Sequence, residues 1–345
     1  MVLTRRGDHA RMPITLWFPN EILTDIIICA TQSDRVTLCC VSKLFHALVI
    51  PILNQHIVLR IRKKCRSFKN LCRALINNPE RIEIVRSLIV IRDFKFNGAI
   101  NYDLLFESLI LMQNLERLSF NCRQDGQTIA ARLASLTFPN LSSCRLDCCF
   151  IESNVADFSD FVARYPSITR FYLRSPGLAL PDDNLQRQQG ILPNLLQYDG
   201  KQLFFHKLCT STLRAVRLGP WYRQVTTSDV QALRARTDHT VPLVLSLGVQ
   251  DIETAEDNIV SLLSAGIPNI QSLQLQISSL HMLWVETLKR ISTDLTQFRH
   301  LAYFAVTDLY LVNVQGAEVI LHTWTAACPT LKGCCIGKQC SPAAI

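Results

Sequence analysis

The sequence predicts an α/β protein in which a short segment of three helices precedes a repeat of parallel strands and helices. Apolar residues at helical spacing between Trp17 and Leu59 predict the first part. From residue 81 onward, a short apolar pattern recurs at intervals of mostly 26 to 31 residues and predicts the second part. The chain of 345 residues is 48 % hydrophobic and 19 % charged, which excludes the disordered class and allows a substantial core.

The helical segment is punctuated by residues that start and stop helices. Phe18–Leu23 opens the first predicted helix, with a proline and a glutamate in its first turn. Gln32–Asp34 interrupts the spacing and can cap a second helix that carries the apolar residues of Val36–Leu48. Pro51 predicts the next break, after which Ile52 begins a third short element. A unit this small, with helices apolar nearly all round, requires a partner on one side.

The repeat is defined by apolar residues at the first, fourth and sixth positions of a six-residue strand, which is the pattern of leucine-rich repeats. Matching segments are 85–90, 115–120, 141–146, 168–173, 213–218, 270–275, 301–306 and 331–336, with a degenerate copy at 195–200 and a weak one at 242–247. The segments between them show helical spacing. Residues 81–345 are therefore predicted to form a solenoid with parallel strands on the concave face and helices on the convex face.

A proline two residues before the first apolar position supports this register. Five repeats carry it: Pro139, Pro166, Pro193, Pro268 and Pro329. Proline cannot continue a helix and favours extended structure in its neighbour. It therefore suits the point where a connecting helix gives way to a strand.

The segment Trp17–Leu59 resembles an F-box, on the basis of Phe18–Leu23, Ser33-Asp34, Val41–Leu48 and Pro51–Leu53. The rest of the chain resembles the leucine-rich-repeat half of F-box proteins of the fungal type. The resemblance implies a tail at 1–15, an F-box at 16–60, a basic helical connector at 61–80 and the solenoid at 81–345. It also implies a non-enzymatic subunit of an SCF-type ubiquitin ligase. In such a ligase the F-box docks on a Skp-family adaptor, and through it on a cullin, while the repeats hold a protein substrate.

Two sets of residues are predicted to form binding surfaces. The resemblance and the apolar pattern together indicate an adaptor-binding set of Pro19, Ile22, Leu23, Ile26, Leu38, Val41, Ser42 and Phe45. The alternative for each residue is that it only packs the helices together. A second alternative concerns the whole chain, which would be an interaction scaffold whose F-box does not support ubiquitination. Stabilisation of a substrate on deletion of this protein would discriminate against the scaffold.

The second set lies between the buried positions of the repeats, where side chains alternate outward along a strand. The outward positions are Arg117, Ser119, Asn121, Ser143, Arg145, Asp147, Arg170, Tyr172, Arg174, Gln197, Asp199, Lys201, Ala215, Arg217 and Gly219. Basic residues outnumber acidic ones among them, which favours an acidic or phosphorylated segment of a substrate. The predicted contacts are Arg117, Arg145, Arg170, Tyr172, Arg174 and Arg217. The alternative is an ordinary solvated sheet face.

The net charge of +8 is concentrated near the N-terminus. Residues 1–66 hold ten Lys and Arg against four Asp and Glu, so the rest of the chain is nearly balanced. This argues against a nucleic-acid-binding surface, and no apolar run is long enough to span a membrane. The basic run Arg60, Arg62, Lys63, Lys64 and Arg66 is either a nuclear-import signal or a solvated connector. A cytoplasmic or nuclear location is expected.

No motif for nucleotide binding, nucleophilic catalysis or a catalytic metal occurs in the sequence, so neither an enzyme nor a cofactor is predicted. Its fourteen cysteines include no CxxC pair, and most, for example Cys144 and Cys334, are expected to be small core residues and not part of a disulfide framework. A zinc site at Cys144, Cys148 and Cys149 and a thiol hydrolase using Cys209 remain the alternatives.

Overall fold

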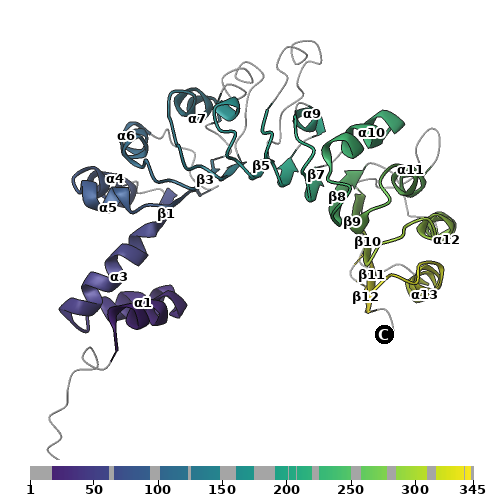
Figure 1. Ribbon diagram of the computed structural model, residues 1–345, viewed down its shortest axis with the longest axis horizontal. Coiled ribbons are helices and arrows are strands. Elements are labelled where there is room, and N and C mark those ends of the chain that lie inside the picture. Colours follow the sequence, from purple (N-terminus) through teal and green to yellow (C-terminus); the bar gives the residue numbers. More distant parts are fainter. Residues whose placement is uncertain are drawn as a thin grey trace, which may run out of the picture. The chain divides into compact units, whose positions relative to one another are not determined.

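In the computed structural model, the chain divides into two compact units. Figure 1 shows the helices and strands with their labels. The first unit comprises Met1–Leu118 with Phe138–Asn140, and the second comprises Ser119–Thr137 with Leu141–Ile345. The structure describes residues 18–61, 66–93, 102–122, 126–147, 161–174, 191–200, 202–206, 208–219, 225–249, 258–277, 285–308, 316–337 and 339–342. The predicted tail at 1–15 lies outside these ranges.

The first unit begins with three helices: α1 (Asn20–Cys29), α2 (Gln32–Cys39) and α3 (Lys43–Gln55). Their shared core consists of Ile27, Val49 and Ile52, with the partly buried Leu38, Cys39, Phe45, Leu48 and Leu53 packed around it. Arg35 ties α2 to the end of α1, because its side chain donates to the carbonyl oxygens of Ile27 and Ile28. The chain therefore forms a small helical bundle before its first strand.

The number of helices matches the prediction, but two of the predicted boundaries are wrong. The second helix ends at Cys39, because Ser42 starts a new one by accepting a hydrogen bond from the amide of Phe45 at 3.2 Å. Pro51 does not end a helix but lies inside α3. Its ring removes only the bond to the carbonyl four residues earlier, and burial of Val49 and Ile52 on either side holds the helix together.

The remainder of the first unit already contains a parallel strand pair. Strand β1 (His56–Ile61) pairs with β2 (Ser87–Arg92), and α4 (Arg66–Ile76) and α5 (Pro79–Glu83) lie between them in the chain. Helix α6 (Asp103–Leu111) follows. Strand β1 was not predicted, so the strand-and-helix region begins at His56 and not at residue 81.

The predicted connector belongs to the folded part of this unit. Phe68, Cys72 and Leu75 of α4 are all buried, at positions that fall on one helical face. Helix α4 therefore packs into this unit along its apolar face. Arg62, Lys63 and Lys64 of the basic run lie outside the described residues.

Strands follow one another in chain order, and all but the last pair are parallel wherever a pairing register is defined. After β3 (Arg117–Asn121), the second unit contains β4 (Ser143–Asp147), β5 (Arg170–Arg174), β6 (Gln197–Gly200), β7 (Ala215–Leu218), β8 (Leu243–Val249), β9 (Ile270–Ile277), β10 (Tyr303–Asp308), β11 (Gly333–Ile336) and β12 (Gln339–Pro342). The antiparallel β12 closes the sheet edge. The fold is therefore α/β with a long parallel sheet, compatible with a solenoid.

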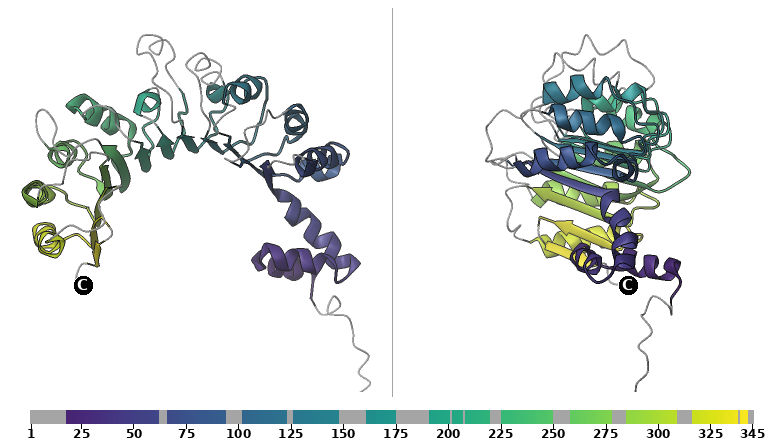
Figure 2. Two further views of the ribbon diagram at one scale, coloured as in Figure 1. Left: turned by 180° about the vertical axis from the view of Figure 1, so that it is seen from behind. Right: turned by 90° about the vertical axis from the view of Figure 1, so that its left-hand side faces the viewer.

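Helices connect the strands of the second unit and lie on one side of them (Figures 1 and 2). They are α7 (Gly126–Leu133), α9 (Gln202–Phe205), α10 (Thr227–Arg236), α11 (Ile259–Gly266), α12 (Val285–Leu295) and α13 (Ala317–Ala327). The opposite face of the strands carries no helix among the described residues and is called the open face below. This arrangement leaves a broad row of strand side chains available for binding.

The predicted apolar register is confirmed. In the segments that begin at residues 85, 115, 141, 168, 213, 270, 301 and 331, the first, fourth and sixth residues are buried throughout. The degenerate copy departs for a packing reason, because its sixth residue is Gly200. A Cβ atom there would collide with the hydroxyl of Tyr198, the fourth residue, whose ring is fully buried. The tyrosine fills the space that two side chains share in the other repeats.

A polar ladder, which sequence reasoning missed, joins successive repeats just before their strands. The residue preceding the first apolar position donates from its side chain to a backbone carbonyl of the repeat before it. The donors are Asn114, Asn140, Ser167, Asn194, Thr212, Asn269 and Thr330. The Pro-Asn pairs are the sequence signal of this ladder, although the proline alone predicts only the start of a strand. The ladder satisfies carbonyls at a helix end or in the segments between a helix and the next strand.

Asn269 makes the strongest rung, so its loss should be the most costly. Its Nδ2 donates to the carbonyls of Asp238 at 3.0 Å and Val241 at 2.8 Å. We expect Asn269→Ala to lower the free energy of unfolding by about 1–3 kcal/mol, because two partly buried carbonyls lose their donor. Asn194→Ala, which removes one exposed hydrogen bond, is the control and should cost less than about 1 kcal/mol. Equal midpoints for both variants in urea unfolding would contradict the ladder's role.

Candidate interaction surfaces

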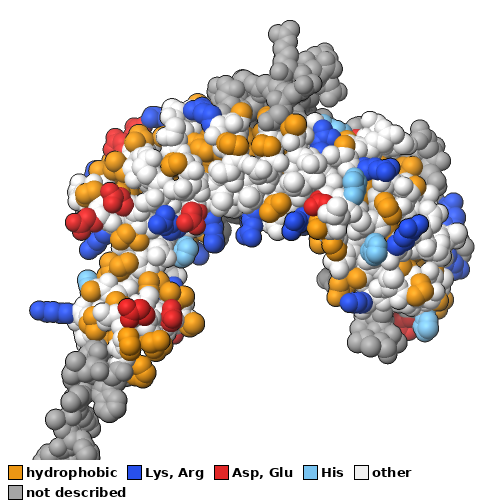
Figure 3. All heavy atoms as spheres, viewed as in Figure 1, with side chains coloured by type: hydrophobic (Ala, Val, Ile, Leu, Met, Phe, Trp, Pro, Cys, Tyr) orange, Lys and Arg blue, Asp and Glu red, His pale blue; other side chains and the backbone are white. Residues whose placement is uncertain are grey.

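An exposed apolar stripe runs along α1. Phe18 precedes the helix, and Ile22 and Ile26 follow at intervals of four residues, which places the three side chains on one side. They are 42 %, 44 % and 54 % exposed. Figure 3, in the view of Figure 1, shows hydrophobic side chains gathered on this helical bundle. Large aliphatic side chains left in water at this density indicate a surface that a partner covers.

A second exposed group lies on α2 and the turn that follows it. Val36 is 54 % exposed and Val41, in the turn before α3, is 62 % exposed. Ile28, near the end of α1, is also exposed. Val36 and Ile28 were missed as surface residues, because helices that are apolar nearly all round do not reveal which side is buried. We call Phe18, Ile22, Ile26, Ile28, Val36 and Val41 the apolar docking patch.

The structure divides the predicted adaptor-binding residues into two classes. Pro19, Ile22, Ile26, Val41 and Ser42 are exposed. Leu23 is only 3 % exposed, and Leu38 and Phe45 are partly buried against the helical core, so these three hold the helices together. Ser42 also has a structural task as the cap of α3. Leu23, Leu38 and Phe45 therefore pack the helices together. Only the exposed residues of the predicted set are available to contact an adaptor.

The second predicted surface is the open face of β4 to β7. The strand register places Arg145, Tyr172, Asp199 and Arg217 side by side in one row. Ser143, Arg170, Gln197 and Ala215 form the neighbouring row. Arg145, Arg170 and Arg217 are all exposed. Three of the predicted arginines therefore lie on four adjacent strands.

Tyr172 organises this surface. The guanidinium of Arg145 lies over the ring of Tyr172, 5.9 Å from its centroid, which is within the range of a cation–π interaction. The Tyr172 hydroxyl donates to Oε1 of Gln197 at 3.4 Å. The tyrosine therefore connects β4 to β6 and limits where Arg145 can point.

Not every predicted outward residue belongs to this surface. Asp147 is 6 % exposed, so the prediction that it faces solvent is wrong. Arg117 is exposed but is part of the first unit, whereas the other residues are part of the second. The side chains of Arg174 and Lys201 lie outside the described residues.

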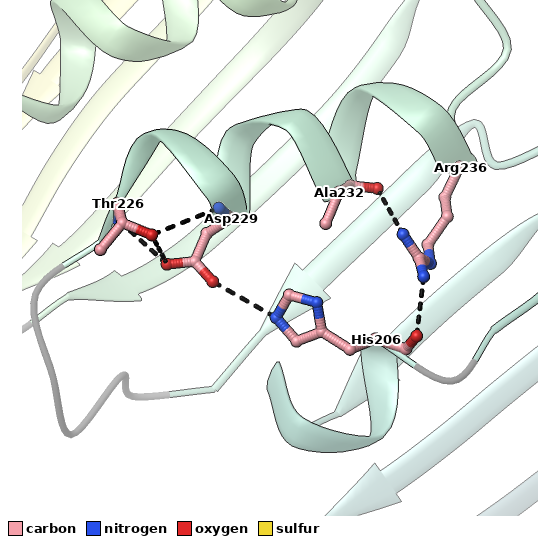
Figure 4. Close-up of polar contacts among 5 residues, drawn as sticks. All are labelled: His206, Thr226, Asp229, Ala232 and Arg236. Carbon is pink, nitrogen blue, oxygen red and sulfur yellow. Dashed lines mark hydrogen bonds and ion pairs between the residues drawn. The ribbon is translucent and has the colours of Figure 1, made fainter. Parts of the chain in front are cut away.

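A partly buried polar cluster fastens α9 to α10 (Figure 4). Arg236 donates to the carbonyl oxygens of His206 at 2.7 Å, Leu208 at 3.0 Å and Ala232 at 3.0 Å. Burial lowers the pKa of the Arg236 guanidinium, and the charge of the neighbouring Cys209 opposes that shift. Because each guanidinium nitrogen is bonded to backbone, Arg236 serves as a clamp between chain segments.

Asp229 completes this cluster from the start of α10. Its Oδ2 accepts hydrogen bonds from the amide and the hydroxyl of Thr226 at 2.9 and 2.8 Å, which forms a capping box. Its Oδ1 lies 3.3 Å from Nε2 of His206. The two atoms form an ion pair when the imidazole carries a proton on both nitrogens, and Nε2 has no hydrogen-bond partner. The carboxylate is thus committed to the helix cap, and the geometry favours a structural role for His206.

Most of the described cysteines behave as small core residues, as predicted. Cys72, Cys122, Cys144, Cys328 and Cys334 are buried and are not part of a disulfide. Cys335 differs, since it is disulfide-bonded, and the residue opposite it in the β11–β12 hairpin is Cys340. Cys148 and Cys149 lie outside the described residues, and no cluster of metal-ligating side chains occurs within the described segments.

The burial of the cysteines leads to a labelling prediction. Burial raises the pKa of the Cys72 thiol to about 11 and raises that of Cys144 as well. Both thiols are therefore protonated and inert at about pH 8, since the thiolate is the reactive form. We expect iodoacetamide to label the exposed Cys29, Cys40 and Cys209 but not these two, as read by mass spectrometry. The same reaction in guanidinium chloride, where all become accessible, is the control. Labelling of Cys144 in the folded protein would contradict its burial.

No protein-family model matches the chain, and a search of curated proteins found no match. Among the helices within the described residues, none is both long and apolar enough to cross a membrane. The functional argument therefore rests on the two surfaces themselves.

Proposed function

We propose that the protein is the substrate-recognition adaptor of an SCF-type ubiquitin ligase. In this proposal the helices α1 to α3 act as the F-box that docks on a Skp-family adaptor, and the repeat holds a protein substrate. The observation that carries it is the apolar docking patch on a small helical bundle that is joined directly to a strand-and-helix repeat. The resemblance of Phe18–Leu23 and Val41–Leu48 to F-box motifs supports it.

The proposed docking depends on burying the exposed aliphatic side chains. Central apolar anchors in protein interfaces commonly contribute about 2 kcal/mol or more each, which corresponds to more than about tenfold in affinity. Glu21 and Asp25 are exposed on the same helix as Ile22 and Ile26 and can form the polar rim of such an interface. A partner with an apolar groove and basic groups at its edge fits this surface.

The proposed mechanism requires no catalytic residue in this chain. Binding the ligase through one surface and a substrate through another makes their encounter effectively intramolecular, which raises the local concentration of substrate lysines. The chemistry of ubiquitin transfer then belongs to other subunits. The working parts of this protein are the apolar docking patch and the open face of the strands.

A binding assay with the full chain tests the proposal. Purified protein is immobilised and mixed with a Skp-family adaptor, alone and in complex with a cullin. We expect the adaptor to be retained and the cullin complex to be recruited through it. Retention of the adaptor without any substrate ubiquitination in a reconstituted reaction would favour the scaffold alternative. If the intact chain does not retain the adaptor, the ligase proposal is wrong.

A further inference from the structure

We propose that the open face of the second unit binds a two-part segment of a protein substrate: an acidic part over β4 to β7 and an uncharged part over β8 to β10. The inference rests on the proposed function only for the statement that the repeats hold a substrate. It adds the chemical class of the bound segment. It also assigns the acidic part of that segment to β4 to β7 and the uncharged part to β8 to β10.

The acidic part is inferred from unneutralised positive charge. Among the described residues, Arg145, Arg170 and Arg217 have no ion-pair partner. Figure 3 shows basic side chains along the open side of the strands near β5. Guanidinium groups bind carboxylates and phosphates with paired, charge-assisted hydrogen bonds. Such groups on adjacent strands repel one another until an anion is bound, so a ligand with negative charges has the complementary chemistry.

Arg145 and Arg170 are the principal side chains proposed to bind the anionic groups of the ligand. They occupy neighbouring rows on adjacent strands, because Arg145 is opposite Tyr172, two residues after Arg170 in β5. The cation–π contact with Tyr172 holds Arg145 in place before a ligand arrives. Tyr172 is itself held by Gln197. An arginine that is already positioned loses less conformational freedom on binding, which strengthens the contact.

The distance between Arg145 and Arg217 determines the spacing of the negative charges that fit this surface. The two arginines belong to one row, with Tyr172 and Asp199 between them. Arg145 and Arg217 are three strands apart, or about 14 Å at the usual strand spacing, and an extended peptide covers that distance in about four residues. The fitting ligand therefore has two acidic groups about four residues apart.

The uncharged part follows from the composition of the next strands. The same two rows continue through Val244 and Ser246 of β8, Ser272 and Gln274 of β9, and Tyr303 and Ala305 of β10. None of these residues carries a charge. Tyr303 is 53 % exposed and offers a flat apolar surface with a hydroxyl group. Amide and hydroxyl groups in this region can bond a neutral polar segment.

Fluorescence polarisation with defined peptides tests this inference on the intact chain. The probe is a labelled peptide of about 14 residues, with two glutamates four residues apart followed by a Ser/Gln tail. One comparison peptide has adjacent glutamates, one has glutamines in their place, and one has phosphoserines in their place. We expect the spaced acidic peptide to bind at least tenfold more tightly than the glutamine peptide. Its affinity should also fall as salt is raised. The tighter of the glutamate and phosphoserine peptides identifies carboxylate or phosphate as the preferred anion.

Matched variants locate the binding to this face. Arg145→Glu/Arg170→Glu should raise the Kd at least tenfold. Arg234→Glu/Arg299→Glu, which makes the same charge change at exposed arginines away from these rows, should change it less than twofold. Equal loss in both double variants, or equal binding of the glutamine peptide, would overturn the inference. So would the absence of binding by both anionic peptides up to about 1 mM, the limit of weak specific association.

The result of the peptide-binding test can be distinguished from the result of the adaptor-binding test. Peptide binding needs no Skp-family adaptor, and adaptor binding uses the apolar docking patch, which these variants leave unchanged. Loss of peptide binding with retained adaptor binding therefore concerns only the substrate class. The reverse result would leave the acidic-segment inference intact in a protein that is not a ligase subunit.

Discussion

Replacing Ile22 and Ile26 by aspartate is expected to weaken binding of a Skp-family adaptor at least about tenfold while leaving the fold intact. Both side chains are about half exposed and belong to the apolar docking patch, so neither contributes to the helical core. In the bound state each aspartate would have to lose water without gaining a partner. A quantitative binding assay gives the affinity, and circular dichroism checks the helices.

Two further variants make this test decisive. Val319→Asp introduces the same kind of change at a 65 % exposed valine on α13, and it should not alter adaptor binding. Ile22→Ser/Ile26→Ser removes the apolar groups without adding charge next to Glu21 and Asp25, and it should also weaken binding. If the aspartate and serine variants bound as tightly as the wild type, the patch on α1 would not be the docking surface.

A variant at Leu23 would give a misleading result. This residue is adjacent to Ile22 in the sequence, but it is buried at 3 % exposure. Leu23→Asp would place a charge inside the helical bundle, so lost binding would report unfolding. The distinction between Ile22 and Leu23 could not be made from the sequence, because both lie in an apolar run with no polar face to set its orientation.

The strands were largely predictable from the sequence because their burial is periodic. All the matching repeats direct three apolar side chains into the same core, and this constraint leaves a pattern even where the residues differ, as at Cys144 and Phe171. Strand β1 has the same alternation, with Ile57, Leu59 and Ile61 buried. It was missed because those residues were assigned to the end of the preceding helical segment.

The surfaces and polar contacts were less predictable because they depend on residues that are distant in the sequence and close in space. Alternation along β4 predicts that Asp147 is exposed, but its environment buries it. The position of Arg145 over Tyr172 joins two strands whose register the sequence only implied. Asn269 reaches carbonyls about 30 residues earlier in the chain, and a local pattern does not report such a contact.

Trp324→Ala is expected to have the largest effect on stability, about 3–5 kcal/mol. The indole of Trp324 in α13 is fully buried, and its ring centroid lies 4.8 Å from that of Phe304 in β10. Its Nε1 donates to the carbonyl of Leu288 in α12 at 2.8 Å. One side chain therefore holds two helices and a strand together, and its removal leaves a cavity among them. Unfolding in urea, followed by circular dichroism, measures the loss.

The damage should also be local, and this follows from the architecture. Units of a repeat contact mainly their neighbours, so stability is approximately a sum of local contributions. Hydrogen exchange in Trp324→Ala should accelerate in α12, α13 and β10 and remain unchanged in β4 and β5. Trp324→Phe keeps most of the volume and removes the hydrogen bond to Leu288, so it should cost about 1–2 kcal/mol. Val319→Ala, at an exposed position of the same helix, should stay within about 0.5 kcal/mol of the wild type. Uniform acceleration across all strands would mean that the second unit unfolds as a single cooperative body and not repeat by repeat.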